Sequence, residues 1–244
     1  MRLAWATDIH LDMTGDTINK VQSIANASRD ADAVLITGDI SVSNMILQHL
    51  SMLEMTLEKQ IYFVLGNHDY GAYLDWKSEK AKAENFVAIK DLHRQIDFKL
   101  MLNENVKIKK GKDEIALMGV ENWGKHFGEF GDIDKASENV TATDFKILMS
   151  HDPSHWEYIV KRHPKNIQLT LSGHTHGMQF GIEIPGYFKW SLAKYIYKQW
   201  AGLYEEFGRY VYVNRGFGFH AYPGRVGIMP EITVFELKKG NIVA

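Results

Sequence analysis

Polar clusters with metal-binding side chains recur along the first three quarters of the chain. Each cluster combines Asp, His or Asn, and each directly follows a short apolar run. The clusters are Asp8-Ile9-His10, Gly38-Asp39, Gly66-Asn67-His68-Asp69, Ser150-His151 and Gly173-His174-Thr175-His176. Carboxylate, imidazole and amide donors in one site are typical of divalent metal ions. The residue types therefore predict a metal centre.

The apolar runs that precede these clusters predict the strands of an α/β fold. They are short and do not alternate with polar residues, which is typical of strands buried on both faces. The runs are Leu3–Thr7, Ala33–Thr37, Ile61–Leu65, Lys146–Met149 and Ile167–Leu171. Because sites in open α/β sheets form at the carboxyl ends of strands, we expect the clusters to meet at one edge.

Further elements are expected between and after these strands. Amphipathic or charged runs predict helices at Thr17–Ser28, Asn44–Glu58, residues 72–98 and Ser154–Arg162. A hairpin is expected where Lys110-Gly111-Lys112-Asp113 separates Val106–Lys109 from Glu114–Val120. Later strands are expected at Tyr210–Asn214 and Ile232–Leu237. No repeat or linker interrupts this pattern, so residues 1–244 are expected to form a single domain.

The number of donors favours two metal ions over one. The candidates are Asp8, His10, Asp39, Asn67, His151, His174 and His176. They exceed what one tetrahedral ion can use, and they suit two ions of higher coordination that share a carboxylate. Mixed nitrogen and oxygen ligation favours Mn, Fe, Zn or Co over Mg or Ca. Gly38, Gly66 and Gly173 precede candidate ligands, where the backbone must turn sharply and approach the ions closely.

Composition and charge exclude several other classes of site. The 244 residues include no cysteine, which excludes disulfides, thiolate metal sites and cysteine nucleophiles. The formal net charge is −2 and no basic stripe is visible, which is unfavourable for a general nucleic-acid binder. No apolar run has the length of a membrane span, and the N-terminus has no signal-peptide pattern. These features predict a cytoplasmic protein without a transmembrane segment.

The five motifs, in this order, resemble those of the calcineurin-like metallophosphoesterase superfamily. Each motif alone is weak, and the resemblance rests on their joint occurrence over residues 8–176. A narrower similarity to the bacterial YkuE-like branch covers Gly202-Leu203-Tyr204, residues 213–218 and Pro230-Glu231-Ile232. In place of that branch's usual Gly-Gly-Gln, this chain has Gly177-Met178-Gln179. The resemblance implies a metallo-dependent phosphatase fold, a four-layer α-β-β-α sandwich of two mixed β-sheets flanked by helices.

The resemblance also implies a role for each candidate residue. The ligands would be Asp8, His10 and His176 for the first ion, Asn67, His151 and His174 for the second, and Asp39 as the bridge between them. His68 would be catalytic without binding metal, protonating the leaving group or stabilising its charge. Asp69 would orient His68.

The expected activity is hydrolysis of a phosphoester. Two cations would lower the pKa of a bridging water, and the resulting hydroxide would attack phosphorus in line. The predicted substrate is a small-molecule phosphodiester or phosphomonoester. A nuclease or nucleic-acid repair phosphoesterase is one alternative. A non-catalytic binding module is another, which the complete set of site residues makes less favourable.

Residues outside the motifs give less specific predictions. The remaining histidines expected in solvent are His49, His93, His126, His155 and His163, whereas His220 is expected to be structural more than substrate-contacting. Arg215 could meet a phosphate or pair with a carboxylate. The region Tyr187–Tyr222 is rich in aromatic residues. They could form an apolar lip for a lipid-linked or nucleoside substrate or a peripheral membrane contact, but we favour rings that cover the second sheet and its edge.

Overall fold

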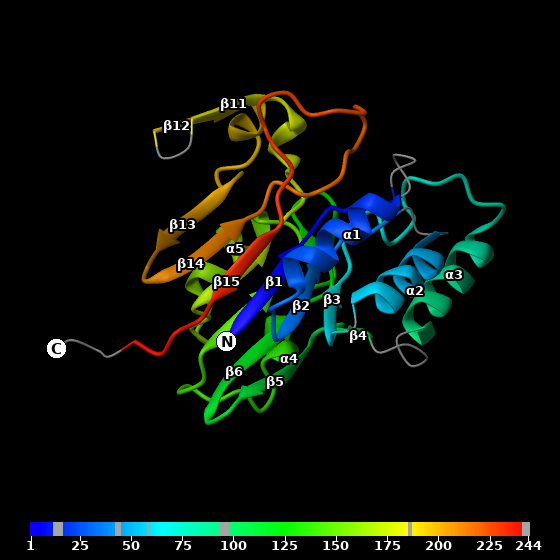
Figure 1. Cartoon of the computed structure of the whole chain (residues 1–244). Coiled ribbons are helices and arrows are strands. Elements are labelled where there is room, and N and C mark those ends of the chain that lie inside the picture. The colour runs from blue at the N-terminus through cyan, green and yellow to red at the C-terminus, as the bar shows by residue number, and fades with distance from the viewer. Residues whose placement is uncertain (12–16, 42–44, 58, 93–97, 185–186, 241–244) are drawn as a thin grey trace.

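Two β-sheets form the centre of the molecule (Figure 1). A computed structural model describes residues 1–11, 17–41, 45–57, 59–92, 98–184 and 187–240. In the first sheet, four parallel strands and one antiparallel strand follow the order β15 (Thr233–Glu236), β1 (Arg2–Ala6), β2 (Ala33–Thr37), β3 (Ile61–Val64) and β4 (Phe98–Leu100). The antiparallel strand is β15, which pairs with β1.

The second sheet is also mixed. Its order is β13 (Gly202–Glu206), β14 (Arg209–Val213), β10 (Leu169–Ser172), β9 (Lys146–Met149), β6 (Asp113–Gly119) and β5 (Glu104–Lys110). The four central strands are parallel, and the two edge strands are antiparallel to their neighbours. The predicted hairpin is confirmed, since Lys110 pairs with Asp113 and Gly111 supplies the positive φ (62°) of the turn.

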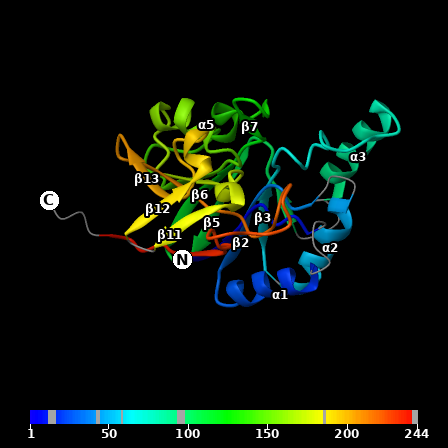
Figure 2. The same ribbon diagram turned by 90° about the horizontal axis from the view of Figure 1, so that it is seen from above.

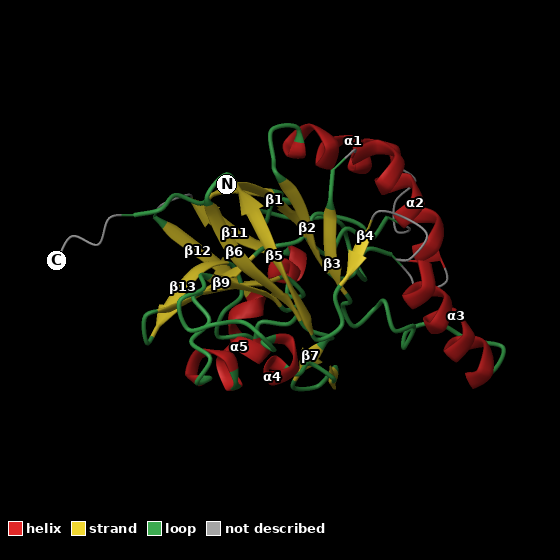
Figure 3. Ribbon diagram, turned by 90° about the horizontal axis from the view of Figure 1, so that it is seen from below, coloured by secondary structure: helices red, strands yellow, loops and turns green. Residues whose placement is uncertain are grey.

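Successive residues of the central strands are buried on opposite faces, which produces four layers. In β2, Leu35 packs between the two sheets with Leu117 and Met149. The next residue, Ile36, packs against Ile24 in the helical layer. That layer contains α1 (Thr17–Ser28), α2 (Ile46–Leu57) and α3 (Glu79–Leu92), while α4 (Ile133–Ala136) and α5 (Ser154–Tyr158) cover the second sheet (Figure 3). The predicted four-layer arrangement of two mixed sheets is confirmed.

Several boundaries differ from the sequence-based expectation. The helix expected over residues 72–98 is limited to α3, because Gly71 turns with a φ of 74° and Trp76 Nε1 donates to the Gly71 carbonyl (2.8 Å). Phe98 already begins β4, and residues 93–97 lie outside the described segments, as do Asn44 and Glu58 at the ends of the expected helix around α2. The expected helix Ser154–Arg162 divides into α5 and the 3₁₀ helix η2 (Val160–Arg162).

A small hairpin after the last His motif was not predicted. Strands β11 (Gly181–Ile184) and β12 (Phe188–Ser191) pair antiparallel and lead into the 3₁₀ helix η4 (Leu192–Tyr195). The hairpin lies at the top of the molecule in Figure 1 and nearest the viewer in Figure 2. Among the helices of the described segments, none combines the length and apolarity that a membrane crossing needs.

Candidate metal centre

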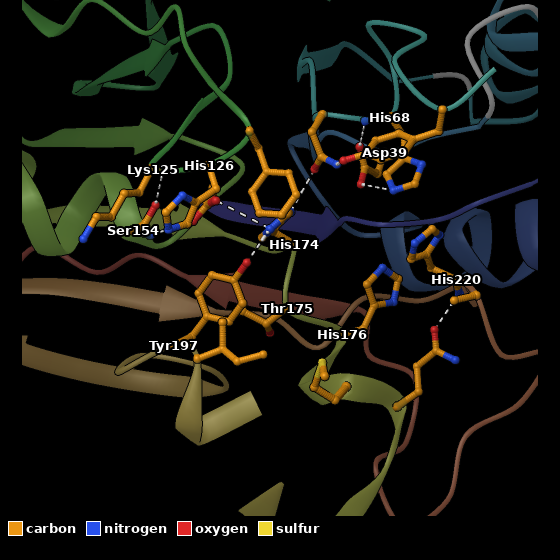
Figure 4. Close-up of a pocket in the computed structure, with 18 of the residues that line it drawn as sticks. Asp39, His68, Lys125, His126, Ser154, His174, Thr175, His176, Tyr197 and His220 are labelled. Atoms are coloured by element: carbon orange, nitrogen blue, oxygen red, sulfur yellow. Dashed lines mark hydrogen bonds and ion pairs between the residues drawn. The ribbon is translucent and has the colours of Figure 1, made fainter. Parts of the chain in front are cut away.

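The five predicted clusters meet at the carboxyl ends of strands from both sheets. Figure 4 shows Asp39, His68, His174 and His176 of these clusters. The loops after β1, β2 and β3 come from the first sheet, and the loops after β9 and β10 come from the second. Backbone hydrogen bonds join them: Asp8 N–H donates to the Gly38 carbonyl (3.0 Å), and Gly173 N–H donates to the His151 carbonyl (2.8 Å). The candidate ligands therefore project from loops that hold one another in place.

One group of donors contains Asp8, His10 and His176, which are all buried. The Nε2 atoms of His10 and His176 lie 3.2 Å apart. His176 Nε2 is also 3.2 Å from Asp8 Oδ1. Two imidazoles and one carboxylate thus point at a common space.

A second group contains Asn67, His151 and His174. Asn67 Oδ1 lies 3.1 Å from His151 Nε2 and 2.8 Å from His174 Nδ1. The two ring nitrogens are 3.3 Å apart. The Asp39 carboxylate completes the arrangement, because its Oδ2 is 3.3 Å from His151 Nε2 and 4.0 Å from His10 Nε2 of the first group.

The spacing of these atoms fits two metal ions. Ligand atoms about 2.1 Å from one ion, at tetrahedral to octahedral angles, lie roughly 3.0–3.4 Å from each other. The nitrogen and oxygen atoms of both groups have nearly this mutual separation. Several of these atoms carry lone pairs that point at one another and repel. A cation bound between them would remove this repulsion. The two groups and their chemistry indicate a divalent metal centre.

The backbone of the site is strained. Five of the seven candidate ligands have a positive φ: Asp8 (49°), His10 (42°), Asp39 (53°), His174 (69°) and His176 (50°). Non-glycine residues avoid this conformation, at a cost of roughly 1–3 kcal/mol each. Strained backbone clusters at functional sites when the fold enforces it. Here it turns side chains from three loops, those after β1, β2 and β10, toward one space.

Two glycines act in different ways. Gly38 has a φ of 89°, and a Cβ atom there would lie 2.7 Å from His151 Nδ1. Gly173 has no positive φ, and glycine is required there for lack of space. A Cβ atom would collide with the Asp8 carboxylate and the Thr7 hydroxyl. At both glycines the backbone approaches its neighbours too closely for a side chain, as expected. Of the two, only Gly38 has the left-handed backbone conformation that a sharp turn requires.

Outer partners fix the orientation of two imidazoles. His151 Nδ1–H donates to the Thr37 carbonyl (2.7 Å), which directs Nε2 toward the other ligand atoms of the second group. His174 Nε2 lies 2.7 Å from the Tyr197 hydroxyl and 3.5 Å from Asp152 Oδ2. That carboxylate favours a proton on Nε2 and leaves Nδ1 free as a donor atom. Such partners orient metal-binding histidines in general.

The protonation states suit a cation site. Burial opposes ionisation of Asp8 and Asp39, but His176 lowers the pKa of Asp8 and His151 lowers that of Asp39. Burial lowers the pKa of His10 to about 3, so its imidazole is neutral near neutral pH. For His151, burial acts in the same direction, but Asp39 raises the pKa to about 10. Asp39 thus attracts positive charge to His151 Nε2, where a metal ion would compete with the proton.

His68 lies beside the two groups and belongs to neither. Its Nε2 is 4.0 Å from Asp39 Oδ2, and its ring stacks on Tyr73 with 4.3 Å between the ring centroids. The expected contact with Asp69 is not formed in the described structure. The Asp69 carboxylate instead accepts from the backbone amides of Asp39 (2.9 Å), Ile40 (3.3 Å) and Gly66 (2.8 Å). Asp69 therefore positions the loops after β2 and β3.

A cavity of about 690 Å³ opens over the centre. In Figure 4, His68, His176 and His220 line the side near Asp39, while Lys125 and His126 line the opposite side. The His220 ring lies 4.3 Å from the His68 ring, measured between centroids. His220 had been expected to be structural, and its place in the cavity wall brings it within reach of a substrate.

Several residues were misjudged or missed in the sequence. His49 and His155 are buried and not solvated, because they bond to Ser41 and Ser150 respectively. His126 is exposed, while His93 lies outside the described segments. Arg215 pairs with Glu183 and Glu231 and does not line the cavity.

Asp152, Tyr197 and Arg225 were not predicted as parts of the site. Arg225 Nη2 lies 3.3 Å from His176 Nδ1 and donates to the Gly218 carbonyl (2.7 Å). No spacing in the sequence marks Tyr197 and Arg225, because they reach the site through loops that follow other elements. Only the position of Asp152, directly after His151, could have suggested its role.

The two mixed sheets, the flanking helices and the Asp and His donor groups define a metal-dependent phosphoesterase. The model of the calcineurin-like phosphoesterase family matches residues 1–178, and the chain belongs to this family. All five sequence motifs lie within the matched region. The predicted superfamily and enzyme class are confirmed.

Individual relatives agree with this assignment. The chain is 29% identical over 244 residues to the metallophosphoesterase YkuE of Bacillus subtilis, covering 96% of this chain and 78% of YkuE. It is also 29% identical over 255 residues to the transmembrane protein with metallophosphoesterase domain of Danio rerio. That match covers 98% of this chain and 53% of the relative, so the chain spans about half of the fish protein. The phosphopantetheinyl hydrolase PptH of Mycobacterium tuberculosis has the same fold, with a TM-score of 0.52, 10% identity and 86% coverage of each chain.

Proposed function

We propose that this chain hydrolyses a phosphodiester or phosphomonoester of a small molecule at a centre of two divalent metal ions. The first ion would be held by Asp8, His10 and His176, the second by Asn67, His151 and His174, and both by Asp39. The mixed nitrogen and oxygen donors suit Mn, Fe, Zn or Co.

The position of the Asp39 carboxylate carries this proposal. Its Oδ2 lies within 4.0 Å of nitrogen atoms in both donor groups, on His10 and His151. A carboxylate between two cations partly neutralises both and allows them to lie close together. One ion would leave the buried donors of one group without a cation, and this supports a pair of ions over a single one.

The carboxylates of the site would balance the charge of the ions and hold the bridging residue in place. Two bound cations would neutralise charge on the phosphoryl oxygens and lower the pKa of an attacking water. Asp8 and Asp39 are buried and ionised, so they balance the positive charge where little water screens it. Asp69 accepts from two backbone amides of the loop that carries Asp39 and from the Gly66 amide of its own loop, which limits movement of the bridge during a reaction.

His68 is proposed to stabilise charge on the leaving oxygen through a hydrogen bond. Its ring lines the cavity beside Asp39 without joining either donor group. Burial lowers the pKa of His68, so its imidazole is neutral near neutral pH and offers one N–H to a leaving oxygen. Stacking on Tyr73 keeps the ring in this position.

The cavity supports a small substrate over a polynucleotide. Among the described residues that line it, Lys125 is the one lysine or arginine. Binding of a nucleic-acid strand relies on several phosphate contacts from basic side chains. A single lysine beside a metal centre is sufficient for the second charge of a small phosphorylated molecule.

The test is hydrolysis of bis-p-nitrophenyl phosphate and p-nitrophenyl phosphate by metal-free protein reloaded with Mn²⁺. We expect turnover that requires metal, and a loss of roughly 10²–10³-fold in His68→Ala at unchanged metal content. His163→Ala, outside the cavity, is the matched control for replacing a histidine. No turnover of either substrate by protein with two bound ions would refute the proposal. Loss of both ions in His68→Ala would make His68 a ligand.

A further inference from the structure

The β11–β12 hairpin has its apolar face toward solvent. Ile182 pairs with Trp190 and Ile184 pairs with Phe188, so these four side chains share one face. Ile184 is 53% exposed and Phe188 is 52% exposed. Antiparallel hairpins on a protein surface ordinarily bury the apolar face and expose the polar one. This hairpin has the reverse orientation.

The polar face of the same hairpin packs on the body of the protein. Glu183 forms an ion pair with Arg215, and Ser191 Oγ donates to the Gly177 carbonyl. Lys189 Nζ donates to the Ala201 carbonyl. These bonds fix the orientation of the hairpin, so the outward apolar face is specified by the fold.

The apolar surface continues beyond the hairpin toward the active site. Leu192 and Tyr195 of η4 are exposed, whereas Ala193 is buried. Ile196, the residue after η4, is also exposed. Ile196 and Tyr197 line the cavity over the metal centre, and the Tyr197 hydroxyl contacts His174. The exposed apolar surface and the cavity are therefore adjacent parts of one face of the molecule.

We propose that this surface, formed by Ile182, Ile184, Phe188, Leu192, Tyr195 and Ile196, docks the protein on a lipid bilayer. Glu183 is the only acidic residue between Met178 and Trp200, and it is paired with Arg215. Lys194 is exposed within the surface, so its charge complements anionic headgroups. The hairpin and η4 also present Tyr and Trp side chains, which favour the membrane interface.

The shape of the surface favours a bilayer over a protein partner. Tyr187, next to Phe188, is 91% exposed and stands clear of the rest of the molecule. A protruding apolar surface can enter a fluid lipid interface without a matching concave partner. Resting on the proposed function, docking would bring the cavity to phosphoesters that are themselves anchored in the bilayer. The aromatic residues of the hairpin, Tyr187 and Phe188, are exposed and do not cover the second sheet. The interpretation favoured from sequence holds for Tyr204, which packs against buried residues of that sheet.

Flotation of the metal-loaded chain with vesicles of equal parts phosphatidylcholine and phosphatidylglycerol tests the docking. We expect the wild type to float with the vesicles. The double variant Ile184→Ser/Phe188→Ser should bind roughly a hundredfold more weakly, about tenfold for each side chain removed from the interface. The matched control is Met55→Ser/Val87→Ser, which replaces exposed apolar residues of α2 and α3 on the other side of the molecule and should float like the wild type (Figure 1).

Three outcomes would overturn the proposal. They are no flotation of the wild type, equal flotation of the double variant, and a dimer in analytical ultracentrifugation that the double variant abolishes. Turnover of water-soluble bis-p-nitrophenyl phosphate is measured on the same samples. Turnover without flotation would support the proposed function and refute the docking. Flotation without turnover would support the docking and refute the proposed function.

Discussion

Lowering the pH should destabilise the folded chain through one buried histidine of the second sheet's helical layer. His155, on α5, is buried, bonds through Nδ1 to Ser150 Oγ (2.8 Å) and stacks on Trp123 with 5.0 Å between the ring centroids. Burial lowers its pKa from 6.5 to about 3. In the unfolded chain the ring is exposed to water and regains the ordinary value.

The direction and size of the effect follow from these two values. Between about pH 6.5 and about pH 3 the unfolded chain binds a proton at His155 that the folded chain does not, so stability falls as the pH falls. At about pH 5 the difference from the unfolded pKa is about 1.5 units, and each unit is worth about 1.4 kcal/mol. The folded state should therefore lose about 2 kcal/mol through His155 between about pH 8 and about pH 5.

Urea unfolding of metal-free wild type and His155→Asn over this pH range measures the effect. Asn retains a group that can bond to Ser150, so the variant tests titration more than packing. Other titrating groups contribute equally to both proteins and cancel in the difference between their pH dependences. The wild type should lose about 2 kcal/mol more than the variant. The same pH dependence in both would show that His155 takes up a proton in the folded state, and the reasoning from burial would be wrong.

Two further predictions concern the metal centre. Asp39→Asn should lower the metal content of the purified chain, measured by atomic emission, and abolish turnover, since one carboxylate serves both donor groups; full activity with two ions would remove Asp39 from the bridge. His220→Ala should keep both ions and lower kcat/KM by roughly ten- to a hundredfold, the effect of one hydrogen bond to a charged phosphoryl oxygen. Wild-type kinetics for His220→Ala would return this residue to a structural role.

The location of the site could be predicted from sequence because its chemistry is local. Asp8, Asp39 and His151 each follow a buried strand directly, and strand ends of one sheet edge converge in any α/β fold. The layers were predictable for a related reason, since the runs around Leu35 and Ile147 contain consecutive apolar residues and need cover on both faces. Residue type and strand periodicity together therefore predict the location of the site and the layers of the fold.

The rest of the site depends on long-range packing. Tyr197 reaches His174 only because η4 folds back over the cavity, and nothing in its sequence neighbourhood differs from that of a surface tyrosine. His155 was expected in solvent on a helix over Ser154–Arg162, but that segment divides into α5 and η2, and the side of α5 that carries His155 is buried. The hairpin was missed for a different reason. The alternation Ile182-Glu183-Ile184 is visible, but polarity alone does not tell which side of a strand faces the protein.

Each donor group takes side chains from both sheets. Asp8 and His10 follow β1 of the first sheet, and their companion His176 follows β10 of the second. A cation held by all three would act as a cross-link between residues 168 positions apart in the chain, as a disulfide does in a secreted protein. Metal binding would then be linked to unfolding, and the melting temperature would rise with the concentration of free metal. The same ions that activate the substrate would clamp the two halves of the sandwich together.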